Sequence, residues 1–449
     1  MQSLMISVSG IRGIVGEGLT PDIVARFSTA FGLFCGGGPI VVGRDTRLSG
    51  PMFEHAVFSG LMAAGCEIIN LGMCTTPTIQ LAVEKLKARG GIAITASHNP
   101  EDWNAVKFMD NRGMFLNAQN GLEVLEIAES KQEGYVHYRD IGTVSHIDNF
   151  NIEHIKAIIC SGTVKPEKMR HRNFNVVVDC VNGAGSIILP DLLLELGCDV
   201  TKINCTPNGD FSRGAEPIPE NLGDLCETVV NTKADIGFAC DPDADRLAVV
   251  DEKGRPLGEE YTLVLSAKLV LSEKKGDIAA NVSTTAALDV VAQEAGVKIH
   301  RTKVGEIHVV QKMIEQNCVI GGEGNGGVIF PEIHYGRDAM VGTALILQYL
   351  SEFEEPLSKL YDRLPHYYIS KRKVTVESKT LNHFIEKTRE ENYAAKIDTT
   401  DGLKLIFPHY WVHLRKSNTE PIVRVIAEAK STEEADSVSG RYAKMLAEQ

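Results

Sequence analysis

A rhythm of short apolar strands alternating with helices repeats three times along this chain and constrains its fold more than any other feature. The three rounds predict strands over 39–42, 67–70 and 91–94, then 175–178, 199–203 and 234–238, then 277–280, 297–300 and 317–320. Helices are expected near 51–64, 77–89, 185–196, 285–295 and 306–316. Apolar strands that alternate with helices are typical of parallel sheets covered on both faces. We therefore expect three related α/β domains with mixed, largely parallel sheets.

The rhythm stops after residue 365, where the pattern predicts a smaller α+β domain. Its expected elements are a strand over 366–376, a helix over 380–396, strands over 403–414 and 422–427, and a helix near 432–447. The predicted domains are therefore 1–150, 151–255, 256–365 and 366–449.

The third strand of each round runs into a polar loop. The three loops have the sequences Thr-Ala-Ser-His-Asn-Pro at 95–100, Asp-Pro-Asp-Ala-Asp-Arg at 241–246 and Gly-Glu-Gly-Asn-Gly-Gly at 322–327. In α/β sheets, ligands bind beyond the carboxyl ends of the strands. We therefore expect the loops to meet at one central cleft, rather than to be three unrelated turns.

The loop at 241–246 predicts a metal site, because Asp241, Asp243 and Asp245 alternate along it. Carboxylates that converge without encircling the ion suit Mg²⁺. A calcium EF-hand is disfavoured: Glu252 stands at the twelfth position, but Arg246 occupies the sixth, which requires glycine. The flanking segments also favour strands over helices, which leaves a solvated acidic turn as the alternative.

Ser97 ends an apolar strand and is followed by His98. Neighbours on an extended chain point to opposite sides, and the G-x-S-x-G elbow is missing, so a hydrolase triad is excluded. Ser97 is then either a nucleophile activated by a metal or a phosphate, or the N-cap of a helix. Lys107, ten residues later, is the nearest candidate acid or base, with a solvated surface lysine as the alternative. Arg246 either pairs with the carboxylates or binds a phosphate.

Two further loops offer polar groups to a ligand. The segment 415–421 combines a guanidinium, two hydroxyls and an amide, carried by Arg415, Ser417, Thr419 and Asn418. It is either a phosphate cradle or a polar hairpin turn. Glu323 and Asn325 present an acceptor and an amide that suit sugar hydroxyls, although glycine-rich turns are common.

Composition limits the partners. With 46 basic and 59 acidic residues, the net charge is −13, which disfavours nucleic-acid and anionic-membrane surfaces. The ten cysteines are scattered without metal-ligand spacing, and neither a signal peptide nor an apolar stretch of about 18 residues is visible. We expect a soluble cytoplasmic protein with reduced thiols.

The four loops, in this order and spacing, resemble those of the α-D-phosphohexomutases, which interconvert hexose 1-phosphates and 6-phosphates. The resemblance covers essentially the full chain. It implies that Ser97 carries a transferable phosphoryl group, and that Mg²⁺ lies on Asp241, Asp243, Asp245 and an oxygen of phosphorylated Ser97. It also implies that Glu323 and Asn325 contact ring hydroxyls. The loop with Arg415, Ser417, Asn418 and Thr419 would hold the non-reacting phosphate.

The same resemblance places Arg12 at the cleft, makes Lys107 the favoured general acid/base and lets Arg246 orient phosphate, with His98 beside Ser97 in the catalytic group. Hexose 1,6-bisphosphate would be the intermediate and activator, held by a mobile fourth domain. A hexose phosphate would be the partner of a monomer or homodimer.

Two departures from the family pattern bear on the sugar. Asn325 stands where many members carry serine, and Gly327 where the loop often ends in histidine. Glu306 follows Val304-Gly305, where many relatives place histidine or arginine, and His308 lies beyond it. We interpret the acid as favouring a phosphoglucosamine mutase, with a phosphomannomutase/phosphoglucomutase as the alternative. A metal-dependent phosphomonoesterase and a regulator that binds sugar phosphates are the readings outside the mutases.

Overall fold

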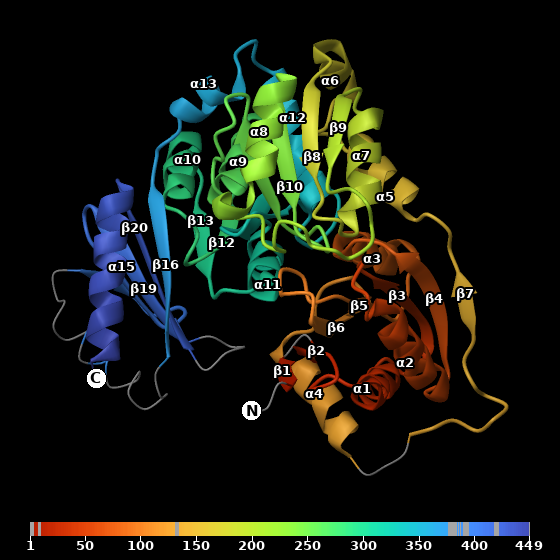
Figure 1. The fold of residues 1–449 in the computed structure, drawn as a ribbon. Helices are drawn as coiled ribbons and strands as arrows, with labels where there is room; N and C mark the ends of the chain where they lie inside the picture. The colour runs from red at the N-terminus through yellow and green to blue at the C-terminus, as the bar shows by residue number, and fades with distance from the viewer. Residues whose placement is uncertain are drawn as a thin grey trace.

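The computed structural model describes residues 4–7, 10–130, 134–375, 384, 386, 388, 395–416 and 422–448. Four separate sheets follow one another along the chain. In Figure 1 the colours run from the first domain at the lower right to the C-terminal domain at the left. The expected fold class is confirmed: three α/β units with parallel strands precede one antiparallel unit.

The first sheet has seven strands in the order β1-β2-β6-β5-β3-β4-β7. The strands are β1 Leu4–Ser7, β2 Gly10–Ile14, β3 Gly38–Arg44, β4 Cys66–Met73, β5 Gly90–Ile94, β6 Trp103–Met109 and β7 Val144–His146. The helices are α1 Pro21–Phe34, α2 Gly50–Ala63, α3 Thr76–Lys85 and α4 Ala118–Glu129. Alternate residues of β3 face opposite cores: Ile40 and Val42 pack with α1 and α2, whereas Val41 packs with α3. Both faces of this sheet are therefore covered.

The second sheet has the order β11-β10-β8-β9 and the third β13-β12-β14-β15. The second unit contains α5 Asn151–Ile159, α6 Pro166–Arg172, β8 Asn175–Asp179, α7 Gly185–Glu195, β9 Asp199–Ile203, the 3₁₀ helix η1 Pro219–Asn221, α8 Gly223–Thr232, β10 Ile236–Cys240 and β11 Leu247–Asp251. The third contains α9 Glu260–Glu273, β12 Ile278–Asn281, α10 Ala287–Ala295, β13 Ile299–Thr302, α11 Glu306–Gln316, β14 Ile320–Glu323, β15 Gly327–Ile329, α12 Ala339–Ser351 and α13 Leu357–Asp362. One hydrophobic core spans both sheets, because α9 and α12 contribute buried residues to it.

The three α/β units repeat one strand order. In each, the first strand of the round lies between the second and third in a parallel ladder, as in β4-β3-β5, β9-β8-β10 and β13-β12-β14. An antiparallel strand, β6, β11 or β15, then pairs with the third. Each polar loop is therefore the connection of a two-stranded antiparallel pair at the carboxyl end of a parallel strand.

The C-terminal unit is an antiparallel sheet in the order β16-β20-β19-β18-β17 with one helix packed on it. Its elements are β16 Tyr368–Thr375, β17 Lys396–Asp398, β18 Leu403–Ile406, β19 Tyr410–Lys416, β20 Ile422–Ala429 and α15 Thr432–Ala447. Most of the helix expected over 380–396 lies outside the described residues, and Lys396 already begins β17.

The single strand expected over 403–414 was wrong. The segment is a hairpin of β18 and β19, closed by a hydrogen bond of 2.9 Å from the Phe407 N–H to the Tyr410 carbonyl. Pro408 has no N–H and interrupts the ladder, but the apolar alternation continues on both sides of it. Among the described residues, none of the helices combines the length and hydropathy needed to span a bilayer.

Candidate active site

Ser97 lies directly after β5 and is 3% exposed. Its φ of 51° is in the left-handed region, which a residue with a side chain adopts only at a cost. The Ser97 N–H donates to Thr95 Oγ1 at 2.9 Å, and the Ser97 hydroxyl donates to Asp241 Oδ2 at 2.7 Å. The strained turn thus directs the serine hydroxyl of the first unit toward the loop at residues 241–246 of the second, which is called the metal loop below.

Arg47 holds the serine loop in that shape. Its guanidinium is 1% exposed and donates to the backbone carbonyls of Ser97, Asn99, Pro100 and Trp103. Asp45 pairs with Arg47 Nε at 3.1 Å and accepts from Thr95 Oγ1 at 2.6 Å. The sequence analysis missed this pair. Asp45 and Arg47 follow β3 at the carboxyl end of a parallel strand, where ligands bind in α/β sheets. That position was the one feature of the sequence that could have indicated a role for the pair.

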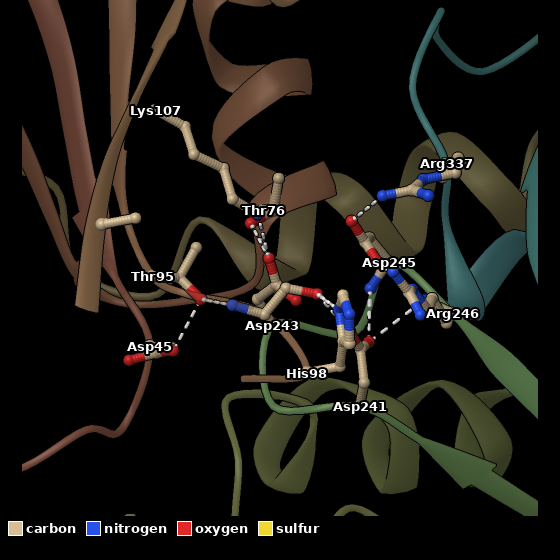
Figure 2. Close-up of polar contacts among 12 residues, drawn as sticks. Asp45, Thr76, Thr95, His98, Lys107, Asp241, Asp243, Asp245, Arg246 and Arg337 are labelled. Carbon is tan, nitrogen blue, oxygen red and sulfur yellow. Dashed lines mark hydrogen bonds and ion pairs between the residues drawn. The ribbon is translucent and has the colours of Figure 1, made fainter. Parts of the chain in front are cut away.

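Protein groups hold both oxygens of Asp241 and one oxygen each of Asp243 and Asp245. Asp241 Oδ1 accepts from the N–H groups of Asp245 and Arg246, both at 3.1 Å. Asp243 Oδ2 accepts from Thr76 Oγ1 at 2.7 Å and from Lys107 Nζ at 2.8 Å, and Asp245 Oδ2 accepts from Arg337 Nη2 at 2.5 Å. Figure 2 shows Lys107 and Thr76 on one side of the carboxylates, and Arg246 and Arg337 on the other.

The opposite oxygens are left for a cation. Among the described residues, neither Asp243 Oδ1 nor Asp245 Oδ1 has a hydrogen-bond partner, and both are buried. Ligand oxygens of Asp241, Asp243 and Asp245 all lie within 4.8 Å of one another, so the group is able to hold a metal ion. An uncompensated set of buried carboxylates is costly, and oxygen ligands suit a hard divalent cation. The donor set therefore fits Mg²⁺.

The charges of the carboxylates interact strongly. Burial raises the pKa of Asp241 well above its ordinary value, and the neighbouring Asp245 and Asp243 raise it further. Burial also opposes ionisation of Asp243, but the ion pair with Lys107 and the hydrogen bond from Thr76 hold the pKa of Asp243 below its ordinary value. Asp241 is thus the carboxyl that benefits most from a bound cation.

Arg246, Arg12 and His98 surround the serine and the carboxylates. Arg246 Nη1 lies 2.8 Å from Glu216 Oε1, and its Nε lies 3.7 Å from Asp245 Oδ1. Arg12 Nη1 donates to Asn99 Oδ1 at 2.7 Å. Burial lowers the pKa of Arg12 and holds the pKa of His98 well below its ordinary value, with Arg246 and Arg12 adding to the effect on His98.

The His98 Nδ1 lies 3.4 Å from Ser97 Oγ. The structure thus brings together Ser97, the three aspartates, Lys107, Arg246, Arg12 and His98, as the sequence analysis expected of the first two loops.

The loop at residues 322–327, which is expected to contact a sugar and is called the sugar loop below, spans the turn from β14 to β15. Glu323 is buried: its Oε1 accepts from Asn281 Nδ2 at 2.9 Å and from the Gly305 N–H at 2.8 Å, and its Oε2 lies 2.7 Å from Arg337 Nη1. Asn325 is half-buried, and its Oδ1 accepts from the Gly327 N–H at 3.2 Å. Protein groups thus fix the orientation of both residues.

Glu306, the residue that follows Val304-Gly305, has its carboxylate bound by protein side chains. It is buried at the start of α11, and its carboxylate accepts from Gln80 Nε2 at 2.9 Å and from Arg337 Nε at 3.0 Å. His308 lies two residues further along α11. Burial and the charge of Lys303 lower its pKa, and it interacts electrostatically with Glu323 and Arg415. Glu306 thus contacts Arg337, which in turn contacts Glu323 and Asp245.

Arg415 lies on β19 of the C-terminal unit, and Ser417, Asn418 and Thr419 lie outside the described residues. Arg415 Nε pairs with Asp401 Oδ2 at 2.7 Å, and the same carboxylate oxygen accepts from the Val304 N–H at 3.0 Å. The C-terminal unit contacts the loop after β12 through three side chains: Lys404 on the Val282 carbonyl, His413 on Ser283 and Glu428 on the Ala286 N–H. Arg415 is therefore placed by contacts with the third unit.

A second buried cluster, not expected from the sequence, joins α5 to the segment before α12. Asp338 Oδ2 lies 2.7 Å from His154 Nε2 and 3.0 Å from His334 Nε2, and the His154 Nδ1 lies 2.9 Å from Thr78 Oγ1. Three donors without a fourth ligand are fewer than a buried structural zinc site takes. The cluster is a hydrogen-bonded link between the first and third units.

Comparisons with known proteins agree with this arrangement. The models of phosphoglucomutase/phosphomannomutase α/β/α domains I, II and III match residues 4–134, 152–254 and 258–368, and that of the C-terminal domain matches 371–445. A phosphoglucomutase/phosphomannomutase of Thermococcus kodakarensis is 42% identical over 435 residues, which are 95% of this chain and 94% of the relative. A phosphoglucosamine/phosphogalactosamine mutase of Sulfurisphaera tokodaii is 33% identical over 98% of this chain and 99% of the relative. A crystal structure of a family protein from Burkholderia thailandensis superimposes with a TM-score of 0.85 at 29% identity, over 98% of each chain.

Proposed function

This chain belongs to the phosphoglucomutase/phosphomannomutase family and is a hexose phosphate mutase, and we propose that Ser97 carries the phosphoryl group that it transfers. One observation supports the assignment above all: the Ser97 hydroxyl lies 2.7 Å from Asp241 Oδ2, at a group of carboxylates with two buried, unpartnered oxygens. A phosphoryl group on Ser97 would therefore lie beside the metal position. Phosphoryl transfer depends mainly on such positioning and charge neutralisation.

In the proposed reaction, a hydroxyl of the bound hexose phosphate attacks the phosphorus of phosphorylated Ser97, and the P–O bond to Ser97 breaks. Lys107 relays the proton of the attacking hydroxyl to the departing Ser97 oxygen, and the products are a hexose 1,6-bisphosphate and the free Ser97 hydroxyl. After the bisphosphate reorients in the site, the Ser97 hydroxyl attacks its other phosphate, the bond from that phosphorus to the sugar oxygen breaks, and Lys107 relays the Ser97 proton to the departing sugar oxygen. A bound Mg²⁺ would supply charge neutralisation on the phosphoryl oxygens.

The remaining side chains hold the substrate in this proposal. Arg246 and Arg12 orient the transferring phosphoryl group through their guanidinium groups. Glu323 and Asn325 contact ring hydroxyls, and the loop with Arg415, Ser417, Asn418 and Thr419 holds the other phosphate. His98 is a neighbour of the serine, and its ring nitrogens can form hydrogen bonds there. A cytoplasmic location and a monomer or homodimer remain predictions.

For the sugar, we propose glucosamine phosphates as the preferred substrates. The relative from Sulfurisphaera tokodaii is named a phosphoglucosamine/phosphogalactosamine mutase and matches 98% of this chain. Its similarity supports this choice. The second candidate is a phosphoglucomutase/phosphomannomutase, favoured by the relative from Thermococcus kodakarensis at 42% identity. Glu306 favours neither directly, because its carboxylate is bound to Gln80 and Arg337.

The test is a kinetic comparison of glucosamine 1-phosphate, glucose 1-phosphate and mannose 1-phosphate, each with Mg²⁺ and a trace of its bisphosphate. We expect 6-phosphate products, with the highest kcat/KM for glucosamine 1-phosphate. A higher value for either neutral sugar assigns the second candidate. Release of inorganic phosphate without isomer formation would instead identify a phosphomonoesterase.

A further inference from the structure

Arg337 lies outside both the metal loop and the sugar loop, but it contacts each of them. It belongs to the segment between β15 and α12, it pairs with Ile329 in an isolated β-bridge, and it is 9% exposed. A single arginine with no local motif around it gives no indication of function in the sequence. Its position in the fold is what makes it informative.

The three nitrogens of the Arg337 guanidinium contact three carboxylates from three elements. Nη2 lies 2.5 Å from Asp245 Oδ2 in the metal loop, Nη1 lies 2.7 Å from Glu323 Oε2 in the sugar loop, and Nε lies 3.0 Å from Glu306 Oε2 at the start of α11. A guanidinium is planar and its donors are fixed relative to one another. The positions of Asp245 and Glu323 are therefore tied to each other through one rigid group.

The contact with Asp245 is on the oxygen that does not face the metal position. Asp245 Oδ1 is buried and has no hydrogen-bond partner among the described residues, whereas Oδ2 is occupied by Arg337. Thr76 and Lys107 bind Asp243 in the same manner, on the oxygen opposite the unpartnered one. Partners that bind the outer oxygen of a metal ligand orient the ligand and influence its affinity for the ion.

The sugar loop is shaped to admit this arginine. A Cβ atom on Gly327 would lie 2.2 Å from Arg337 Cδ and 2.9 Å from Cγ, so only glycine leaves room for the aliphatic part of Arg337. The glycine and the arginine thus form one fitted pair that closes the sugar loop against the metal loop.

We propose that Arg337 is a positioning residue that fixes Asp245 for the metal and Glu323 for the sugar through a single guanidinium. The inference rests on the proposed roles of those two carboxylates. Because both contacts belong to one rigid group, a change that moves Arg337 alters metal binding and sugar binding together. An arginine that merely joined the second and third units would affect stability and neither form of binding.

The first test uses Arg337→Lys, which keeps the charge but loses the three-way contact. The matched control is Arg255→Lys: Arg255 also joins two carboxylates from different elements, Asp251 at 2.8 Å and Asp362 at 2.9 Å. Mg²⁺ affinity is measured by titration calorimetry on the protein without sugar. We expect Arg337→Lys to weaken Mg²⁺ binding about 10- to 100-fold, the usual effect of removing an outer partner of a metal ligand, and Arg255→Lys to leave it unchanged.

The second measurement is the KM for hexose 1-phosphate at saturating Mg²⁺, which Arg337→Lys should raise at least severalfold. Gly327→Ala gives an independent variant, because its methyl group displaces Arg337 without changing any charge; it should weaken Mg²⁺ binding in the same direction. Thermal unfolding of each variant establishes that it is folded. If Arg337→Lys is unfolded, the Gly327→Ala measurement decides.

The inference is overturned if a folded variant binds Mg²⁺ within twofold of the wild type, or if metal affinity falls while KM stays unchanged. The calorimetric measurement needs no turnover. If the wild-type protein binds Mg²⁺ but converts no hexose phosphate, the proposed function is contradicted. The effect of Arg337 on Mg²⁺ affinity is still measured in that case.

Discussion

Lys107 Nζ lies 2.8 Å from Asp243 Oδ2, so the amine proposed to move the proton is paired with a carboxylate proposed to bind the metal. The two residues come from different units, β6 and the loop after β10. A cation bound at Asp243 Oδ1 would draw on the same negative charge that pairs with Lys107. Metal binding and proton transfer are therefore electrostatically linked at this one carboxylate.

Replacement of Ser97 by alanine is expected to abolish measurable mutase turnover, because the phosphoryl acceptor is removed. Intact-mass analysis after incubation with hexose bisphosphate should show a phosphorylated species in the wild type and none in Ser97→Ala. Ser49→Ala, which changes a serine that accepts from Asn104 Nδ2, is the control and should retain both properties. Wild-type turnover in Ser97→Ala would exclude the proposed mechanism.

Removal of divalent cations should abolish turnover and lower the thermal unfolding temperature. In the part of the chain that the structure describes, Asp243 Oδ1 and Asp245 Oδ1 are buried without a hydrogen-bond partner, so a bound cation would favour the native state. Added Mg²⁺ stabilises the native state by mass action, at about 2.7 kcal/mol when its concentration is 100 times its Kd. The measurement is a thermal melt with a chelator and then with excess Mg²⁺. Asp245→Asn should show a smaller Mg²⁺-dependent shift, and an identical shift would argue against this site.

Arg47→Met is expected to destabilise the protein by about 3 kcal/mol or more. It leaves the buried carbonyls of the serine loop without their donor and Asp45 without its partner. Urea unfolding measures the loss, and the rate of Ser97 phosphorylation should fall as the loop loosens. Arg112→Met, at an arginine whose side chain is 60% exposed, should change stability by no more than about 0.5 kcal/mol.

Glu260 gives a pH prediction. Burial raises its pKa to about 8, against the opposing effect of Lys371. Since the folded state favours the protonated acid, its contribution to stability is greatest at low pH and is lost as the pH rises from about 4.5 to about 8. Glu260→Gln mimics the neutral acid and still accepts from the Thr285 N–H.

The variant should therefore be increasingly stabilised relative to the wild type across that range, by up to about 4 kcal/mol. Urea unfolding at several pH values makes the comparison. A stability difference between Glu260→Gln and the wild type that does not change with pH would contradict the raised pKa.

Much of the fold was predictable because local pattern and tertiary environment agree in it. The central parallel strands β3, β5, β8 and β10 contain buried apolar runs, and the helices over 285–295 and 306–316 were placed to within two residues as α10 and α11. The long helices α9 and α12 were missed, since both are buried around nearly their whole circumference and have no polar face to mark a helical period. The strands β6, β11 and β15 were not assigned as antiparallel partners, because pairing direction depends on contacts distant in sequence.

For the site, the sequence supplied the groups that cluster in short motifs. Three aspartates within five residues form a recognisable motif, whereas Arg47 binds carbonyls 50 to 56 residues away and Arg337 binds carboxylates 14, 31 and 92 residues away. No local pattern distinguishes such an arginine from a surface one. The sequence pattern singled out Glu306 as the residue after Val304-Gly305 but did not predict its partners. Only the fold brings its carboxylate to Gln80 and Arg337.

The shared strand order has a consequence for how such an enzyme changes. The proposed nucleophile, metal ligands and sugar contacts lie in or beside three turns, and each turn joins two paired strands of a different sheet. In the turn after β14, the Gly326 carbonyl accepts from the Leu247 N–H at 3.0 Å, so this turn contacts the second unit as well as its own sheet. An exchange of residues 324–326 with those of a relative would therefore change the sugar loop and its contact with the unit of the metal loop at the same time.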